Sequence, residues 1–424
     1  MKLSSDDLPM FFSEAHVRLA DRLRAAAPAI AAVEQLADAA RDRAAAVVLA
    51  EAGLFSLVVP GPEPAVAGDH EETRRERRPR GPRGGAPRPR SQPGEAVPPE
   101  STPTAPLIDS RALCLAREML AYVSPRADSI LAVQGLGTYA IGAAGSVAQR
   151  AALPAFARGS QVAAFALTEP EAGSDVAAIA TRATATSDGY RIDGDKLFIS
   201  NLGIADHAML VATTDPGLGN AGLTAFWLPL DARGVTVTPM TAIAAHPIGA
   251  LALRGVALPA SARIGEVGQG MKLALATLDA FRVSVGAAAV GMARRALDEA
   301  IGFVTRRSQF GKLLSDQPLV QAHLADMVVD LDAARLLVLR AAHLKDTTGA
   351  AQTTEVSIAK LGATEAAQRV IDRAVQLFGG RGVMAGAVVE QLYRAIRPLR
   401  IYEGTSEIQR TIIGRALARQ GRGP

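Results

Sequence analysis

Residues 399–410 read Leu-Arg-Ile-Tyr-Glu-Gly-Thr-Ser-Glu-Ile-Gln-Arg. This stretch is the most informative part of the chain, because it places one carboxylate, Glu403, directly before a glycine, a threonine and the start of an amphipathic helix. Taken alone, Glu403 is most simply interpreted as an exposed acid near a helix N-terminus, where the helix dipole favours negative charge. A catalytic base is the other interpretation, and the surrounding sequence has to decide between them.

The chain on both sides of this stretch is mainly helical. Apolar residues recur at helical intervals from 12 to 56 and from 110 to 157, and Pro28 marks a candidate break in the first run. Towards the carboxyl end, long segments are expected to form a helical bundle. Their predicted ranges are 269–305, 316–347, 352–378, 386–396 and 406–419.

Between the two helical parts, residues 162–256 have a different texture. Short apolar runs are separated by Gly, Asp and Pro, which is typical of a small β-barrel or sandwich. The predicted fold class is therefore α+β and mainly α. We expect a helical N-terminal domain at 1–160, a central β domain at 161–265 and a C-terminal four-helix bundle at 266–424.

One segment inside the N-terminal part stands apart in composition. Residues 61–106 are rich in Arg, Pro and Gly and contain almost no large apolar side chain. Such a segment buries too little surface to offset the entropy of ordering it, so it is predicted to be a disordered insertion. A solvated linker is the simpler interpretation, and a polybasic contact with a partner is the alternative.

The overall composition excludes several classes of protein. A chain of 424 residues has room for two or three domains, and its formal charge of +4 does not indicate a nucleic-acid partner. The single cysteine, Cys114, rules out an internal disulfide and fits a reducing cytoplasm. No apolar stretch suggests a membrane span, and the first residues lack the apolar core of a signal peptide. We expect neither a membrane anchor nor a metal site.

Two motifs together resemble the acyl-CoA dehydrogenase family. Tyr-Glu-Gly-Thr-Ser-Glu-Ile-Gln-Arg at 402–410 is similar to the family's sequence around its catalytic base, and Phe-Ala-Leu-Thr-Glu-Pro-Glu-Ala-Gly-Ser-Asp at 165–175 is similar to its second signature. The order of helices, β structure and helices also matches the family. With these motifs around it, Glu403 is interpreted as the catalytic base.

The resemblance implies an α,β-dehydrogenation of an acyl-CoA thioester with FAD. Glu403 would remove the α-proton while a hydride passes from the β-carbon to the flavin N5, and burial would raise the pKa of Glu403 towards working pH. Some relatives carry the base on an earlier helix, but Phe281 stands at that position and cannot accept a proton. The residues expected to bind the substrate are Ser174, Asp279, Arg282, Tyr402 and Gly404.

The family's cofactor contacts carry over to two groups of residues. The first comes from the central domain: Phe165, Leu167, Thr168, Phe198, Ile199 and Ser200, with Ser200 offering its hydroxyl to N5. The second comes from the helical half and implies that the FAD site lies at a subunit boundary: Arg307, Gln309, Phe310, Gln376, Phe378, Gly379, Gly380, Thr405 and Glu407.

Plain structural roles remain open for several of these residues. The 168–175 segment has ordinary turn chemistry, and Phe198 has the pattern of a strand core residue. The glycines at 379–380 suit a helix C-cap, and Asp279 with Arg282 suits an ion pair between helices.

The chain also departs from the family pattern in three places. Val-Pro-Gly-Pro-Glu at 59–63 runs into the Arg/Pro insertion near the expected substrate entrance, and Gln317-Pro318 replaces a usual cofactor contact. The loop at 244–250, Ala-Ala-His-Pro-Ile-Gly-Ala, lacks the family's common sequence, and His246 is interpreted as a surface-loop residue. The length of the acyl chain is therefore not determined by the sequence.

The expected partners follow from the same resemblance. Electrons would pass to an electron-transfer flavoprotein, and the enzyme would be a cytoplasmic homodimer or homotetramer of fatty acid metabolism. An oxidase that uses oxygen and a catalytically silent binding protein are the alternatives. The substrate is an acyl-CoA or an acyl group on a carrier protein.

Overall fold

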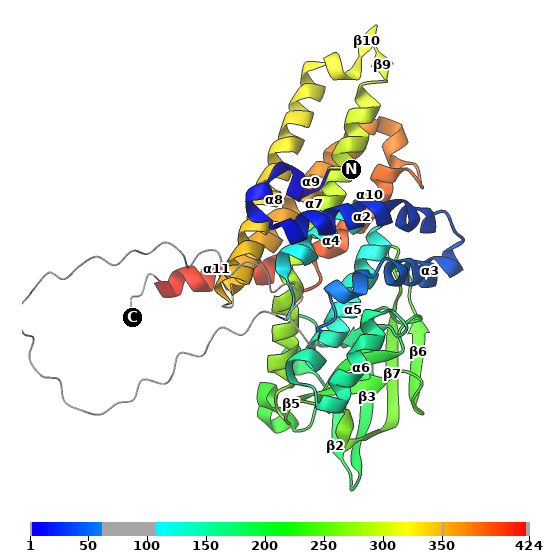
Figure 1. Ribbon diagram of the computed structural model, residues 1–424, viewed down its shortest axis with the longest axis vertical. Coiled ribbons are helices and arrows are strands. Elements are labelled where there is room, and N and C mark those ends of the chain that lie inside the picture. The colour runs from blue at the N-terminus through cyan, green and yellow to red at the C-terminus, as the bar shows by residue number, and fades with distance from the viewer. Residues whose placement is uncertain (1, 62–106, 350–351, 421–424) are drawn as a thin grey trace, which may run out of the picture.

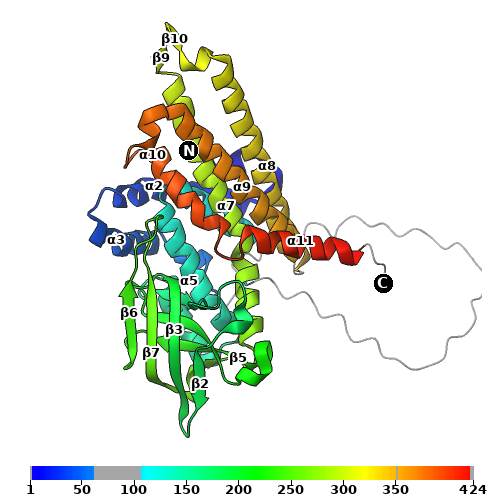
Figure 2. The ribbon, with the colours of Figure 1, turned by 180° about the vertical axis from the view of Figure 1, so that it is seen from behind.

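The computed structural model describes residues 2–61, 107–349 and 352–420, so the predicted disordered insertion lies outside the described residues, apart from Gly61. The order of helices, β structure and helices is confirmed. Figures 1 and 2 show the sheet at one end of the molecule and the long helices at the other, with α2 and α3 along one side. The domain limits at 160 and 265 stay predictions.

The N-terminal part is helical throughout its described residues. Asp109 caps α4 by accepting a hydrogen bond from the Ala112 N–H, and Ser124 caps α5 in the same way from Ala127. The α-helices are α1 (Ser4–Asp7), α2 (Glu14–Val33), α3 (Asp38–Glu51), α4 (Ser110–Val123), α5 (Pro125–Ala144) and α6 (Val147–Ala157).

Pro28 does not divide the first helix, so the candidate break there is wrong. Helix α2 continues through Pro28, and the chain turns only after Val33. Pro28 is exposed, whereas Leu23 and Ile30 on either side of it are fully buried. Packing of that apolar face holds the helix together despite the one backbone hydrogen bond that proline cannot make.

The central strands form one mixed sheet with the order β6-β7-β3-β2-β4-β5-β8, and β1 pairs with β4 in parallel. In the long antiparallel pair of β3 and β7, the register shifts between Lys196 and Ile199. Phe198 sits in that bulge with a φ of 59°, and its side chain is turned outward. The strands are β1 (Ala163–Ala166), β2 (Arg182–Ala185), β3 (Gly189–Ser200), β4 (His207–Thr213), β5 (Leu223–Pro229), β6 (Val235–Pro239), β7 (Ile248–Pro259) and β8 (Arg263–Ile264).

The C-terminal helices agree closely with the predicted ranges. Helix α7 packs against α4, α8 and α9, and α11 extends away from the bundle in both views (Figures 1 and 2). The helices are α7 (Gly270–Val304), α8 (Pro318–Thr348), α9 (Thr353–Phe378), α10 (Val388–Ile396) and α11 (Ser406–Gln420). A two-stranded hairpin, β9 (Ser308–Gln309) and β10 (Lys312–Leu313), was not predicted.

Helix α7 carries the most apolar long stretch among the described residues. By length and composition it would be able to cross a membrane, which the sequence pattern had not indicated. Within the protein, 78% of its apolar window is buried against neighbouring elements. Its composition is therefore accounted for by its central place in the helical core.

Candidate active site

Glu403 lies in a tight turn between the last helical turn of 397–400 and α11. Its φ is 52° and that of Gly404 is 91°, so two successive residues adopt left-handed backbone conformations. The φ of residue 404 is one that side chains disfavour, and a Cβ there would also lie 2.5 Å from the Gln409 side-chain nitrogen, so glycine is favoured at this position. A glutamate with positive φ is uncommon and persists only where the surrounding structure holds it.

Side chains from three helices hold this turn. The carbonyl oxygen of Glu403 accepts hydrogen bonds from Arg282 Nε of α7 at 3.2 Å and Gln409 Nε2 of α11 at 3.4 Å. The carbonyl oxygen of Gly404 accepts from Lys360 Nζ of α9 at 2.7 Å and again from Gln409 at 3.0 Å. These bonds fix the position of the Glu403 backbone and hence the origin of its side chain.

One oxygen of the Glu403 carboxyl group is removed from water, and the residue as a whole is half-buried. Its Oε2 atom is buried and has no hydrogen-bond partner among the described residues. Burial raises the pKa of Glu403 above the usual glutamate value, while the positive charges of Arg117, Arg282 and Lys360 oppose that rise. The simple interpretation as an exposed acid at a helix N-terminus is therefore wrong, and the group has the environment of a desolvated base.

A buried ion pair lies beside Tyr402 and Glu403. Arg117 of α4 donates from Nε and Nη2 to the two oxygens of Asp128 on α5, both at 2.8 Å, and from Nη1 to Ser284 Oγ on α7 at 3.0 Å. Burial raises the pKa of Tyr402 well above its usual range. The sequence pointed to neither Arg117 nor Asp128, because no local pattern shows that a residue of α4 pairs with a residue of α5.

Lys360 is a second residue that sequence reasoning missed. Burial lowers the pKa of Lys360 to about 8, with the charge of Glu403 acting in the opposite direction. The available signal was a lysine among the apolar residues of α9, where Val356, Ala359 and Ala363 are all buried. A buried lysine normally has a specific partner, and here that partner is the catalytic turn.

Asp279 and Arg282 form an ion pair of 3.4 Å within α7, so the expected pair between helices is wrong. Lys345 of α8 donates to the Asp279 carbonyl at 2.6 Å. Phe281 stands between Asp279 and Arg282 in the sequence. Its side chain is fully buried and packs edge-on against Tyr139, with ring centroids 6.1 Å apart. Arg282 therefore connects Asp279 to the Glu403 turn.

The first group of predicted cofactor residues meets where β1 and β3 end. The Thr168 carbonyl accepts from the Leu197 N–H at 2.9 Å, and Lys196 Nζ donates to the Leu167 carbonyl at 3.0 Å. Phe198 is 57% exposed, so its interpretation as a strand core residue is wrong.

The other members of this group differ in exposure. Phe165, Thr168 and Ser200 are half-buried at the same edge of the sheet. Leu167 and Ile199 are buried, which leaves their backbone as the part able to meet a ligand. Ser174 is exposed in the loop that follows.

Ser200 has an unexpected neighbour. Its Oγ lies 3.2 Å from Nε2 of His246, whose other ring nitrogen, Nδ1, lies 3.0 Å from the Ala244 carbonyl oxygen. His246 lies in a loop, as predicted, but it is half-buried and its ring nitrogens have protein neighbours.

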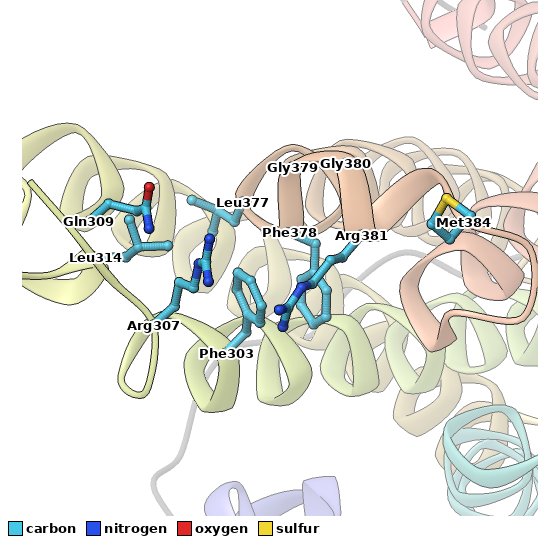
Figure 3. Close-up of a pocket in the computed structure, with 10 residues that line it drawn as sticks. All are labelled: Phe303, Arg307, Gln309, Leu314, Leu377, Phe378, Gly379, Gly380, Arg381 and Met384. Atoms are coloured by element: carbon cyan, nitrogen blue, oxygen red, sulfur yellow. The ribbon is translucent and has the colours of Figure 1, made fainter.

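Five residues of the second group line an open hollow of about 520 Å³ at the junction of α7, the β9–β10 hairpin and the end of α9. The rings of Phe303 and Phe378 stack with centroids 4.3 Å apart, and Arg381 lies over Phe303 (Figure 3). The hollow is lined by Phe303, Arg307, Gln309, Leu314, Leu377, Phe378, Gly379, Gly380, Arg381 and Met384.

This hollow fits part of a dinucleotide. Arg307 and Arg381 supply two guanidinium groups, which suit a pyrophosphate, and the aromatic pair offers a surface for a flat ring system. A Cβ on Gly379 or Gly380 would meet nothing within 4 Å, so the backbone there faces open space. Gly379 also donates its N–H to the Gln376 carbonyl, so the C-cap role and a ligand role coexist.

The remaining residues of the second group lie apart from the hollow. Gln376 is exposed near the end of α9, and Phe310 is 96% exposed at the tip of the β9–β10 hairpin. Thr405 caps α11 by accepting from the Ile408 N–H at 3.3 Å, and Glu407 is exposed.

One chain therefore does not bring the hollow together with the first group, although Thr405 and Glu407 follow Glu403 directly in the chain. Figure 1 shows the β9–β10 hairpin at the far end of the bundle from β3. Either the cofactor contacts come from two copies of the chain, or one of the two groups does not bind it.

Comparison with known proteins identifies the class to which this fold and site belong. Family models described as "Acyl-CoA dehydrogenase, middle domain" and "Acyl-CoA dehydrogenase, C-terminal domain" match residues 164–256 and 268–418. The chain is 41% identical over 316 residues to FadE25 of Mycobacterium tuberculosis, named as a probable acyl-CoA dehydrogenase, which covers 73% of this chain and 81% of that relative.

A second relative and a solved structure agree. The human mitochondrial short-chain specific acyl-CoA dehydrogenase is 38% identical over 270 residues, 63% of this chain and 65% of its own length. The structure of butyryl-CoA dehydrogenase from Megasphaera elsdenii aligns with a TM-score of 0.80 and 29% identity, over 96% of this chain and 99% of that one. The chain belongs to the acyl-CoA dehydrogenase family, and it is an FAD-dependent oxidoreductase.

Proposed function

We propose that this protein removes the α- and β-hydrogens of an acyl-CoA thioester, with Glu403 as the base. The observation that carries the proposal is the buried, unpartnered Oε2 of Glu403 in a turn held from α7, α9 and α11. A carboxylate without a protein partner in a water-poor site is free to accept a proton from a substrate. Family membership supplies the reaction class.

The same turn offers a donor for the thioester oxygen. Among the described residues, the backbone N–H of Glu403 donates to no other protein group. Its direction is fixed because the two following carbonyls are tied to Arg282, Lys360 and Gln409. An oriented N–H stabilises the negative charge that develops on the oxygen as the α-proton leaves.

FAD, when bound, accepts the hydride from the β-carbon. We assign Thr168, Phe198 and Ser200 to its flavin end, with Phe165 and the backbone of Leu167 and Ile199 beside them. The guanidinium-lined hollow, with Arg307, Gln309, Phe378, Gly379 and Gly380, would hold the same cofactor from a neighbouring copy, which explains why the two groups are separate in one chain. Phe310, Gln376, Thr405 and Glu407 would contribute at the same boundary, in a homodimer or homotetramer.

The substrate contacts are assigned from their positions around the base. Tyr402 and Gly404 adjoin the base, Arg282 with Asp279 borders it, and exposed Ser174 would meet the CoA portion.

The electron acceptor we propose is an electron-transfer flavoprotein. A relative that is 38% identical over 269 residues is subunit CarC of the caffeyl-CoA reductase-Etf complex of Acetobacterium woodii. A structure with a TM-score of 0.79 and 28% identity comes from work on the electron transferring flavoprotein of Acidaminococcus fermentans. A cytoplasmic location stays a prediction.

Glu403→Gln tests the proposal directly. The amide keeps the size of the side chain but cannot accept the proton, so flavin reduction by acyl-CoA should slow by about 100- to 10,000-fold. The measurement is anaerobic bleaching of flavin absorbance with a panel of acyl-CoAs of graded length and branching. Glu51→Gln, a change at an exposed carboxylate of α3, is the matched control. Undiminished reduction in Glu403→Gln would reject the assignment, and peroxide release in air would indicate an oxidase.

A further inference from the structure

The loop that carries His246 is fastened to the end of β3. The Pro247 carbonyl accepts a hydrogen bond from the Asn201 N–H at 2.8 Å, and Met240 donates its N–H to the Ile248 carbonyl at 2.9 Å. His246 Nε2 lies 3.2 Å from Ser200 Oγ. The imidazole is thus held against the Ser200 hydroxyl in two ways. One is its own contact with that hydroxyl, and the other is the backbone hydrogen bond between Asn201 and Pro247, the residue after His246.

The other ring nitrogen decides the direction of this hydrogen bond. Nδ1 lies 3.0 Å from the Ala244 carbonyl oxygen, which can only accept, so Nδ1 carries the proton. In the neutral ring Nε2 is then an acceptor, and the Ser200 hydroxyl must donate to it. The oxygen of Ser200 keeps its lone pairs free to accept from another donor.

We propose that His246 is a positioning residue that sets the direction of the Ser200 hydrogen bond to the flavin N5. This inference rests on the proposed function, in which Ser200 faces that atom. With its proton committed to His246, Ser200 accepts from the N–H that position 5 bears in reduced flavin. Unlike the contact that the family resemblance implies, it offers no proton to the bare nitrogen of oxidised flavin, so the arrangement favours reduction.

The surroundings of His246 keep the ring neutral near pH 7. Burial lowers the pKa of His246 below its usual value, the charge of Asp42 on α3 raises it, and Arg126 on α5 lowers it. Arg126 and Asp42 carry opposite charges and are hydrogen-bonded to each other, so their effects on the ring oppose one another. At low pH the ring becomes cationic, Nε2 donates to Ser200, and the hydroxyl proton is released towards oxidised flavin.

The midpoint potential of the purified flavoprotein tests this device. In His246→Ala the Ser200 proton is free to bond oxidised flavin. We expect the equilibrium to shift about tenfold towards the oxidised form at pH 7.5. For a two-electron couple this shift lowers the midpoint potential by about 30 mV. His207→Gln removes a partly buried histidine that stacks on Trp227 in the same sheet, and it should leave the potential unchanged. An unchanged potential in His246→Ala overturns the proposal.

Two further measurements separate this role from a merely structural one. In a Ser200→Ala background, His246→Ala should no longer shift the potential, and an equal shift there would overturn the action through Ser200. In apoprotein labelled with 15N-histidine, the ring shifts of His246 should show the proton on Nδ1, and a proton on Nε2 would overturn it. Bleaching of the wild-type protein by acyl-CoA is read separately, so a failure of the proposed function is distinguishable from a failure of this inference.

Discussion

The carboxyl group of Glu403 is subject to two opposing influences. Burial disfavours its charge, while the guanidinium groups of Arg117 and Arg282 and the ammonium of Lys360 favour it. Burial dominates, so the pKa is raised above the usual glutamate value. A base with a raised pKa is a better proton acceptor while it is still ionised near neutral pH.

As the pH is lowered, the rate of flavin reduction should therefore begin to decrease at a higher pH than the titration of a free glutamate would give. Only ionised Glu403 accepts the α-proton, and its folded-state pKa lies above the usual value, so activity is full above that pKa and is lost as pH falls through it. Anaerobic stopped-flow reduction by a saturating acyl-CoA between pH 5 and 8 measures this limb. A rate that follows the titration of an ordinary exposed glutamate would contradict the assignment.

Lys360→Met should move the same limb towards higher pH. The change removes one of the three cations that favour ionised Glu403, so the pKa of that carboxyl rises further and the rate at a fixed pH on the limb becomes smaller. Lys345→Met is the matched control, because Lys345 is also a lysine of the bundle bonded to backbone carbonyls, but its bonds go to Asp279 and Ala280. Equal shifts in both variants would show a general effect of losing a buried charge.

At the scale of elements, periodicity predicted the helices well and single residues predicted their interruptions poorly. The range predicted for the first bundle helix, 269–305, contains the observed α7, Gly270–Val304. Pro28 was given too much weight, because packing of a long apolar face outweighs one missing hydrogen bond. The β9–β10 hairpin was missed because its turn, Phe310-Gly311, places a phenylalanine at positive φ where Asn or Asp is usual.

Pro28→Ala should stabilise the N-terminal helices. Alanine restores the N–H that proline lacks in the helix interior, and we expect a gain of about 2 kcal/mol in the free energy of unfolding after the lost rigidity of the unfolded chain is included. Pro125 is the matched control, since it stands at the first position of α5, where proline is favourable. Urea denaturation followed by circular dichroism should show a higher midpoint for Pro28→Ala than for the wild type. The midpoint for Pro125→Ala should not be raised.

At the scale of the whole molecule, the sequence motifs predicted many candidate site residues. They did not predict which residues from other parts of the chain lie next to them. Glu403, Phe198 and Arg307 stand in recognisable runs of sequence. Their neighbours, including Lys360 and His246, come from segments far away in the chain, and no local pattern fixes which of them meet. No sequence pattern indicated how far the hollow lies from the cofactor residues of the central domain, and the β9–β10 hairpin beside the hollow is at the opposite end of the molecule from β3 (Figure 1).

That separation predicts complementation between two defective variants. Glu403→Gln disables the part of the site that holds the base, and Gly380→Trp should fill the hollow without disturbing the fold, because a Cβ there meets nothing within 4 Å. If each site combines the base of one copy with the hollow of its partner, a mixed dimer has one site with both defects and one intact site. Random mixing in equal amounts should restore about a quarter of the wild-type sites.

The restored activity should appear only when the two variants are co-expressed or reassembled together, read as acyl-CoA-dependent flavin bleaching per chain. Gly414→Trp is the control for Gly380→Trp, because residue 414 on α11 also has open space at its Cβ but does not line the hollow. Each chain in the mixture still carries a defect, so a site contained within one chain would give no recovery at all. Recovery thus depends on the partner copy completing the cofactor site, and its absence with both variants folded would place the whole site within a single chain.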